Sequence, residues 1–433
     1  MGERHRVFPF KLGVTGSSPT RGPSAGYARQ LIWKGEDMPY EHASRLSRRE
    51  FLLRLAGGTI VFLTAEEIWS LASWAQTGER PTDPEFITRV NRPQDLESPP
   101  QWLTSWLTPN NRFFVRSHFG PPSPSSLKDW QLHVEGDVKQ RLTLSFSDLK
   151  AFEEVTLHAV VQCAGNGRAF FRPKVPGVQW ERGAVGNAKW AGVRLGDVLK
   201  RAGLGSKAKH VQLLGADRPV LPTVPLFIRS IPIEKAMHPT TMLAYEMNEE
   251  PLPILHGAPL RLIVPGWAGD TCMKWLTHLT VQEDEADGFY MQTAYRMPVT
   301  PVQPGAIIHP SEMIPVTEMA VKSIIARPLE GAKVPGGTVQ VEGVALTGEG
   351  EIVRVQISMD EGKQWYDANL GEERAPYAWR LWRYAWKGMK PGSYTILSRA
   401  TDSRGHTQPM ATPWNPGGFL WNGADVVRIE IEA

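Results

Sequence analysis

The stretch Val160-Val161-Gln162-Cys163-Ala164-Gly165-Asn166-Gly167-Arg168 (VVQCAGNGR) joins an apolar run to a cysteine and then to a turn rich in glycine. This order predicts a strand that ends at the cysteine and is followed by a tight turn. A thiolate at a strand end, beside glycines that let a bulky group approach the backbone, is typical of a soft metal ligand. An isolated buried cysteine is also often an inert, small apolar residue. On these residues alone, both interpretations stay open.

The segment around this stretch, residues 101–312, mixes strand-like and helix-like runs. Short helices are predicted at Leu195–Ala202 and Ile233–Met237. The chain contains neither a GxGxxG motif nor a P-loop. We therefore expect a mixed α/β domain without a nucleotide-binding loop. Apolar and β-branched runs predict strands at Leu132–Glu135, Thr156–Gln162, Val211–Leu214, Leu260–Val264 and Leu279–Gln282.

A second domain is predicted over residues 313–433, after the proline-rich stretch Met297–Pro315. Its apolar runs alternate with polar residues and are separated by turns rich in Gly and Asp. Strands at this spacing, without helical stretches, predict a β-sandwich of immunoglobulin type. The expected fold class is α+β, with the mixed domain first and the sandwich second. The predicted strands are Thr338–Leu346, Ile352–Ser358, Ser393–Ala400 and Val426–Ile431.

The bulk composition excludes several classes of protein. The 433 residues carry a net charge of +3 and no stripe of Lys and Arg interleaved with aromatic residues, so nucleic acid is not expected as a partner. The two cysteines form neither a CxxC pair nor a cluster with histidines, which argues against a zinc site. No CxxCH occurs, so we expect no c-type haem in this chain.

The N-terminal region contains an export pattern. An arginine pair, Arg48-Arg49, precedes the apolar run LLRLAGGTIVFLTA and the small residues around Ser73-Trp74-Ala75. This order predicts a twin-arginine signal over residues 45–75, preceded by an unassigned extension (1–44) and followed by a polar linker (76–100). The expected location is the periplasm or another exported compartment. The alternative is an amphipathic helix of the mature protein.

Several motifs, taken in order along the chain, resemble the sulfite oxidase family of molybdopterin oxidoreductases. QCAGNGR is similar to the family's QCAGNRR segment, and the stretch Thr108–His118 is similar to its PNxxFFxRNH segment. The resemblance runs from about Trp102 to the C-terminus and favours the bacterial, exported, sulfite dehydrogenase-like branch. Further matches are Gly177–Trp180, Trp190–Leu195, Ser230–Pro232, Leu243–Asn248, His256–Gly266, Lys274–Leu276, Tyr295 and Trp414–Pro416.

This resemblance implies an enzyme that holds a molybdenum–molybdopterin cofactor and oxidises sulfite, or a related sulfur oxyanion, to sulfate by oxygen-atom transfer. It implies that Cys163 is the only protein ligand to the metal, the other two sulfurs coming from the pterin. The implied catalytic residues are Tyr295, Arg116, Arg168 and Trp180. The implied cofactor-binding residues are Phe114, Val115, Arg116, Ser117, His118, Asp217, His256, Arg261 and Lys274.

Two positions depart from the animal members of the family. Gly167 stands where the NRR segment has its first arginine, and Gly417 stands where those enzymes place an arginine of the substrate pocket. Fixed positive charge suits a dianionic substrate. We therefore expect weaker binding of sulfite or a different sulfur compound as substrate, unless Arg404 or another residue compensates. Cys272 is interpreted as a buried, inert thiol.

The resemblance also implies partners. Because the chain has no haem motif, electrons are expected to pass to an external c-type cytochrome or haem subunit, and the second domain is expected to form a homodimer. One alternative is a molybdopterin enzyme that reduces methionine sulfoxide. A second is a secreted scaffold protein without catalysis. A third, thiol redox chemistry at Cys163, lacks a resolving cysteine nearby in the sequence.

Overall fold

The computed structural model describes residues 86–432. The predicted extension and signal segment lie outside these residues. Among the described helices, none combines the length and apolarity that crossing a membrane requires. The described part begins with a two-stranded antiparallel pair, β1 (Ile87–Val90) and β2 (Asp95–Glu97). This pair differs from the polar linker expected at 76–100, because Asp95 and Glu97 are buried and hydrogen-bonded by later segments.

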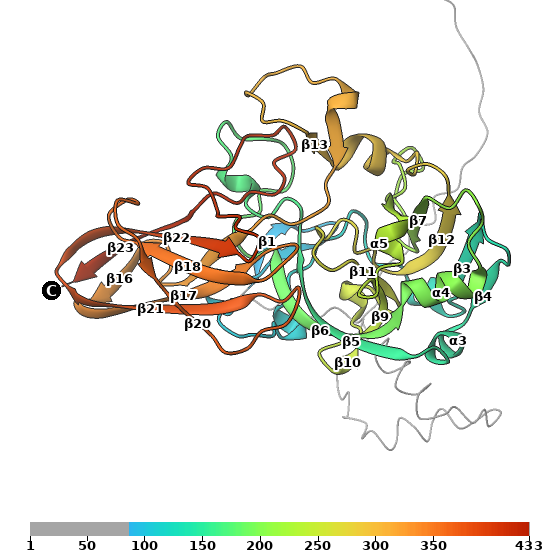
Figure 1. The fold of residues 1–433 in the computed structure, drawn as a ribbon, viewed down its shortest axis with the longest axis horizontal. Coiled ribbons are helices and arrows are strands. Elements are labelled where there is room, and N and C mark those ends of the chain that lie inside the picture. The colour runs from blue at the N-terminus through green and yellow to red at the C-terminus, as the bar shows by residue number, and fades with distance from the viewer. Residues whose placement is uncertain (1–85, 433) are drawn as a thin grey trace, which may run out of the picture. The chain divides into compact units, whose positions relative to one another are not determined.

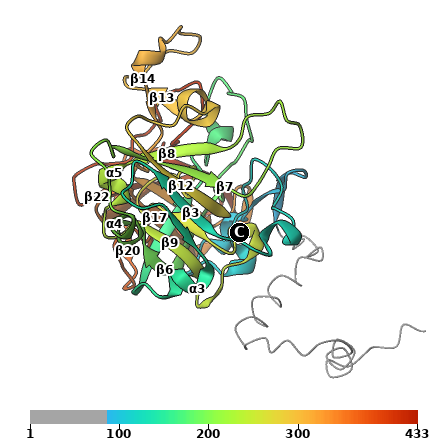
Figure 2. The same cartoon turned by 90° about the vertical axis from the view of Figure 1, so that its right-hand side faces the viewer.

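The N-terminal part of the fold contains two sheets, the first antiparallel and the second mixed (Figures 1 and 2). In the first sheet, β5 pairs antiparallel with β6, and β6 pairs with β9. In the second, β12 pairs parallel with β3 and antiparallel with β7. The first sheet comprises β5 (Glu154–Gln162), β6 (Val185–Arg194), β9 (Met242–Met247), β10 (Glu250–Pro251) and β11 (Arg261–Ile263). The second comprises β3 (Leu132–Gly136), β4 (Leu142–Leu144), β7 (His210–Gly215), β8 (Ile228–Pro232) and β12 (Leu276–Gln282).

Three short helices, α3 (Phe146–Lys150), α4 (Leu195–Ala202) and α5 (Ile233–Ala236), connect these strands. The α3 helix begins at Ser145, whose side chain accepts a hydrogen bond from the amide of Asp148 while the Asp148 carboxylate accepts from the amide of Ser145. Apolar residues from both sheets and from α4 form one core. The predicted strands and the two predicted helices of this region all occur, with ends that differ by a few residues.

A short π-helix, η6 (Tyr290–Ala294), and the antiparallel pair of β13 (Arg296–Pro298) and β14 (Met313–Pro315) follow the second sheet. β14 lies beyond residue 312, the predicted end of the first domain, and pairs with a strand before it. The predicted boundaries of the first domain, at residues 101 and 312, stay predictions.

The C-terminal part is built from two sheets that pack against each other as a β-sandwich (Figure 1). Along β23 (Asp425–Glu432), every second side chain is buried, which places Val427, Ile429 and Ile431 in the core. One sheet comprises β15 (Lys322–Arg327), β17 (Gly337–Leu346), β20 (Asn369–Leu370) and β21 (Arg380–Met389). The other comprises β16 (Ala332–Pro335), β18 (Ile352–Ser358), β19 (Tyr366–Asp367), β22 (Gly392–Asp402) and β23.

The sandwich and the N-terminal sheets share a buried apolar cluster. Val160 of β5 and Val185 of β6 pack with Ile324 of β15 and Val344 of β17. Because β5 ends at Gln162, this contact fixes the strand that leads directly to Cys163.

Candidate active site

One cavity brings together most of the residues that the sequence predicts for the site. It holds about 720 Å³ of empty space, a volume that includes its open mouth. All predicted residues except Val115, Arg168 and Trp180 line it. The predicted residues that line it are Phe114, Arg116, Ser117, His118, Cys163, Asp217, His256, Arg261, Lys274 and Tyr295.

Cys163 lies at the wall of this cavity, directly after β5. Its amide donates to the carbonyl of Ala184 (2.9 Å), and its own carbonyl accepts from the amide of Asn166 (2.9 Å), which closes the predicted turn. Gly167 adopts φ +96°, a backbone conformation that favours glycine. A Cβ atom at Gly165 would lie 2.6 Å from the guanidinium of Arg168. The two glycines thus allow the turn to fold tightly against the arginine that closes it.

Burial raises the pKa of the Cys163 thiol above its ordinary value, and the neighbouring guanidinium groups of Arg116 and Arg168 act in the opposite direction. A metal ion would add further positive charge at the sulfur, and metal ligation requires the thiolate. The site therefore favours release of the thiol proton when a cation binds.

Arg116 projects into the cavity from the segment after Phe113. Its Nη1 atom lies 3.2 Å from both carboxylate oxygens of Asp95 and also donates to the carbonyl of Ser117. Burial opposes the charge of this guanidinium, but Tyr295, Asp95 and Cys163 raise its pKa above the ordinary value. Asp95 comes from β2, in the region that was expected to be a linker, and sequence analysis did not identify it.

Arg168 is buried beside the cavity without lining it. Its Nε donates to the carbonyl of Gly417 (3.0 Å), and its Nη1 donates to the carbonyl of Val178 (3.2 Å). Its guanidinium carbon lies 5.2 Å from the ring centre of Phe419. Burial lowers the pKa of Arg168, which the proximity of Cys163 and Tyr295 partly offsets. Within the described residues, no carboxylate lies within ion-pair distance of this guanidinium.

Tyr295 and His118 form the third feature of the site. The Tyr295 hydroxyl and His118 Nε2 share a hydrogen bond of 2.8 Å. The His118 ring stacks on Phe227, with ring centres 3.9 Å apart. Burial, together with the nearby Arg116, lowers the pKa of His118 well below its ordinary value, so the ring is neutral near pH 7. Burial raises the pKa of Tyr295, so its hydroxyl keeps its proton.

Two buried cations lie on the C-terminal half of the cavity lining. The Lys274 ammonium donates to Ser117 Oγ (2.8 Å) and to the carbonyl of Leu255 (2.9 Å). Arg261 donates only to backbone carbonyls, those of His256 (2.8 Å) and Cys272 (3.3 Å), and its Nε has no partner among the described residues. Burial lowers the pKa of Lys274 to about 7 and that of Arg261 to about 10.

The remaining predicted cofactor-binding residues contribute shape and polarity. Burial raises the pKa of Asp217 to about 6, which the nearby Lys274 partly opposes. His256 shares a hydrogen bond of 3.0 Å between its Nε2 and the carbonyl of Asn110. Its ring packs edge-on against Phe113, with ring centres 5.5 Å apart. His256 is thus held by the segment that also leads to Arg116.

Val115 and Trp180 are buried beside the cavity and do not line it. Val115 is buried and exchanges two backbone hydrogen bonds of 2.9 Å with Leu96, which bridges the segment to β2. The side chain of Trp180 is fully buried in the core and packs edge-on against Phe114, with ring centres 6.5 Å apart. It supports Phe114, which lines the cavity, and does not reach the cavity itself.

A second buried pair at the cavity was not identified from the sequence. Asp270 lines the cavity, and one of its carboxylate oxygens lies 2.8 Å from Arg229 Nη2. Arg229 is fully buried, and its guanidinium carbon lies 5.3 Å from the centre of the Tyr295 ring. Burial raises the pKa of Asp270 to about 6, which Arg229 opposes. Arg229 and Asp270 are 41 residues apart in the sequence, so no local sequence pattern predicts their ion pair.

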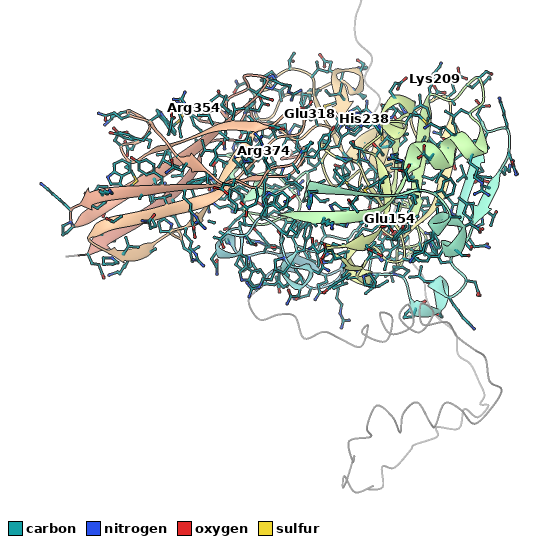
Figure 3. The ribbon with its side chains drawn as sticks, turned by 60° about the horizontal axis from the view of Figure 1, so that its bottom comes forward. Glu154, Lys209, His238, Glu318, Arg354 and Arg374 are labelled. Carbon is teal, nitrogen blue, oxygen red and sulfur yellow. The ribbon has the colours of Figure 1, made fainter. Side chains whose placement is uncertain are left out.

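Gly417, one of the two departures from the animal family pattern, affects the packing beside the cavity. The carbonyl of Gly417 accepts from Arg168, while a Cβ atom at Gly417 would lie 2.1 Å from the Phe419 ring. That ring stacks on Tyr295, with centres 5.3 Å apart. Arg404 does not line the cavity, because its side chain pairs with Glu318, labelled in Figure 3. Arg404 therefore does not replace the missing charge.

Two domain families match the chain in separate segments. The oxidoreductase molybdopterin-binding domain matches residues 118–290. The Mo-co oxidoreductase dimerisation domain matches residues 313–432. The first match contains the cysteine turn, and the second contains the sandwich. These matches identify molybdopterin as the cofactor of this chain.

Similar proteins agree with the domain matches. Mitochondrial sulfite oxidase of Rattus norvegicus is 37% identical over 365 residues, which cover 79% of this chain and 65% of the rat protein. The chain thus spans less than two thirds of the length of that relative. Sulfite oxidase of Arabidopsis thaliana is 31% identical over 368 residues, which cover 79% of this chain and 93% of the plant protein.

A solved structure extends the similarity to the fold. The sulfane dehydrogenase SoxCD of Paracoccus pantotrophus superposes with a TM-score of 0.68 at 26% identity, covering 82% of this chain and 89% of that one. The match spans both the N-terminal sheets and the sandwich, and it confirms the expected fold class. The plant relative, the two domain matches and this architecture together show that the chain belongs to the sulfite oxidase family.

Proposed function

We propose that this chain is a molybdopterin-dependent oxidoreductase that oxidises sulfite, or a related sulfur oxyanion, to sulfate. The observation that carries the proposal is the arrangement around Cys163: a buried thiol at a cavity wall, with Arg116 and Arg168 beside it and Tyr295 nearby. In the reaction, water supplies the oxygen, sulfite becomes sulfate, and two electrons and two protons leave.

The residues of the cavity fit the cofactor. Within the described residues, neither Arg261 nor Lys274 has a carboxylate at ion-pair distance, although both are buried. Buried cations without an acidic partner are costly unless an anion binds them, and a pterin phosphate is such an anion. Cys163 supplies the soft ligand that suits molybdenum. The bound group supplies a two-electron redox centre and an oxygen atom for transfer.

The chain's own residues would then hold and orient the substrate. Both arginines contribute positive charge for an oxyanion. Arg116 lines the cavity but is partly neutralised by Asp95, whereas Arg168 lies beside the cavity without a carboxylate partner among the described residues. The hydroxyl of Tyr295, which keeps its proton, can donate a hydrogen bond to an oxygen of the substrate or of water, and His118 Nε2, 2.8 Å away, can orient that hydroxyl.

The test is to produce the chain in cells that make the pterin and receive molybdate, and to measure the metal and the activities. The proposal expects about one molybdenum per chain and sulfite-dependent reduction of cytochrome c. Reduction of methionine sulfoxide by a reduced dye, without sulfite oxidation, would favour the sulfoxide reductase. A protein without molybdenum and without either activity would favour the scaffold.

A second candidate substrate is sulfane sulfur, the substrate class named for the Paracoccus relative. The observation that favours it is the Phe419 ring, which lies against Tyr295 and under Arg168 next to Gly417. With glycine at position 417 and this ring packed against it, the region beside the pocket carries less positive charge than it would with an arginine at position 417. Comparing kcat/KM for sulfite with that for a thiosulfate-derived persulfide separates the two substrates.

We further propose that the chain is exported by the twin-arginine pathway and passes its electrons to a c-type cytochrome or haem subunit, as a homodimer with an immunoglobulin-type sandwich. Arg48-Arg49 supports export, and the absence of a CxxCH motif supports an external acceptor. The double variant Arg48→Lys, Arg49→Lys should leave the protein in the cytoplasm, as measured by cell fractionation. Normal export of this variant would refute the pathway.

A further inference from the structure

The sandwich buries a lysine beside the cysteine turn. Lys322, the first residue of β15, is 1% exposed. Its ammonium donates to the carbonyl of Asn166 (3.2 Å) and lies 5.1 Å from the ring centre of Trp421. The acidic group that acts on it most strongly, Asp425, is already paired with Arg182 at 2.8 Å.

Such a position is unfavourable for folding. A buried ammonium loses its hydration, and a backbone carbonyl with an aromatic ring restores only part of it. Burial accordingly lowers the pKa of Lys322 to about 7. An apolar side chain of similar length would fill this space at a lower cost. The lysine therefore calls for a role other than stabilising the fold.

Three further contacts connect the sandwich to the same turn. The amide of Leu420 donates to the carbonyl of Ala164 (2.8 Å). The ring of Trp421 packs so closely on Gly167 that a Cβ atom there would lie 2.8 Å from it. The carbonyl of Gly417 accepts from Arg168. Four of the five residues after Cys163 are thus contacted from the C-terminal part of the chain.

The backbone of Leu420, which makes one of these contacts, adopts an uncommon conformation. Its φ is +52°, a left-handed conformation that is uncommon for a residue other than glycine. Such conformations persist where the surrounding structure holds them, and they cluster at functional sites.

We propose that the sandwich domain clamps the Cys163 turn, and that Lys322 is the positioning residue that keeps the thiol directed at the cavity. The matched dimerisation domain would then have a second role within its own subunit, as part of the frame of the metal site. The assignment of Cys163 as a metal ligand rests on the proposed function, but the clamp itself can be measured without molybdenum.

The test compares the two cysteines of the cofactor-free full chain by alkylation with iodoacetamide and peptide mass spectrometry. Cys163 and Cys272 are the only cysteines and both are buried, so Cys272 is an internal reference. In Lys322→Met, alkylation of Cys163 should accelerate at least about tenfold, while that of Cys272 should stay unchanged. Removing a nearby positive charge cannot lower the pKa of the thiol, so the acceleration reports movement of the turn.

The matched control is Lys333→Met, which removes an exposed lysine on β16 of the same sandwich. It should leave both alkylation rates unchanged. The thermal midpoint of Lys322→Met should equal or exceed that of the wild type, because a buried charge is removed. Equal acceleration at both cysteines would indicate general loosening, and no acceleration at Cys163 would show that Lys322 does not hold the turn. Either result overturns the proposal.

A second variant guards against compensation by the methionine. Trp421→Leu removes the ring that covers Gly167 and Lys322 and should also accelerate alkylation selectively at Cys163. In protein loaded with molybdenum, both variants should lose the metal faster than Lys333→Met during dialysis. If the wild type binds no molybdenum but selective alkylation is observed, the clamp stands and the proposed function fails.

Discussion

The two cysteines of this chain line the same cavity, yet their surroundings differ. Burial raises the pKa of both thiols. Cys163 has two arginines near its sulfur and follows the end of a strand, whereas Cys272 has only Arg261 nearby and accepts a hydrogen bond from the amide of Val264 (3.4 Å). One carboxylate acts on each thiol, Asp95 on Cys163 and Asp270 on Cys272, so the two sites differ in their number of arginines. The surrounding positive charge, and not the residue type or burial, distinguishes Cys163 as the proposed metal ligand.

The largest expected effect comes from exchanging each sulfur for oxygen. Cys163→Ser should abolish turnover and leave the fold largely intact, because serine is a poor ligand for a soft metal. The matched variant Cys272→Ser should retain molybdenum and turnover of the same order as the wild type, because a serine hydroxyl can also accept the hydrogen bond that the amide of Val264 donates to this thiol. Steady-state sulfite oxidation measures both. Turnover in Cys163→Ser, or its loss in both variants, would erase the distinction between the two cysteines.

Tyr295→Phe should lower kcat about a hundredfold, within the range for loss of a group that transfers a proton, with a smaller change in KM. The hydroxyl that bonds His118 is lost, while the stacking with Phe419 remains. His118→Phe is the companion variant and should show a similar decrease in kcat. A change confined to KM would place Tyr295 in substrate binding alone.

The two arginines beside Cys163 should differ from each other. Arg168→Gln should raise KM for sulfite about a hundredfold, because a hydrogen bond to a charged group contributes about 1.5–3 kcal/mol. Arg116→Gln should raise KM at least about tenfold, corresponding to roughly 1.4 kcal/mol, because Asp95 already offsets part of its charge. Arg172→Gln, on an arginine that bonds only nearby backbone carbonyls, is the control. Unchanged KM values in both variants would show that neither arginine binds the anionic substrate.

The smallest expected effect is on thermal stability and concerns Lys274, a buried lysine of the cavity lining. The pKa of Lys274 falls from its ordinary value of 10.5 to about 7 in the folded, cofactor-free chain. Between these two values the unfolded chain binds a proton that the folded chain does not, so stability falls progressively as the pH drops from about 10.5 to about 7, and the loss is complete below about 7. Lys274→Met should therefore raise the thermal midpoint more at pH 6 than at pH 9. An equal rise at both pH values would show that the charge of Lys274 does not limit stability.

Local sequence patterns predicted much of the fold. The alternation in Val426–Ile431 identified a strand with one buried face, and the apolar run before Cys163 identified the strand that carries it. These predictions succeeded because the alternation of apolar residues and the presence of turn residues are both determined within a few neighbouring positions of the chain. The cavity residues were reached through the family resemblance, since residue type alone left Cys163 open between ligand and inert thiol.

The contacts that were missed join residues far apart in the chain. Asp95 pairs with Arg116 across 21 residues, and Lys322 reaches Asn166 across 156 residues. A short polar stretch such as the one around Asp95 has the composition of a linker, and only its partners explain its burial. Trp180 illustrates the converse, because a tryptophan in a site motif supports the wall from within the core.

The most direct test of the central claim counts the sulfur atoms bound to molybdenum by X-ray absorption spectroscopy in the wild type, Cys163→Ser and Cys272→Ser. The family resemblance implies three sulfurs in the wild type, two of them from the pterin. We predict one sulfur fewer in Cys163→Ser and no change in Cys272→Ser. An unchanged sulfur count in Cys163→Ser, or a wild type without molybdenum, would contradict the account.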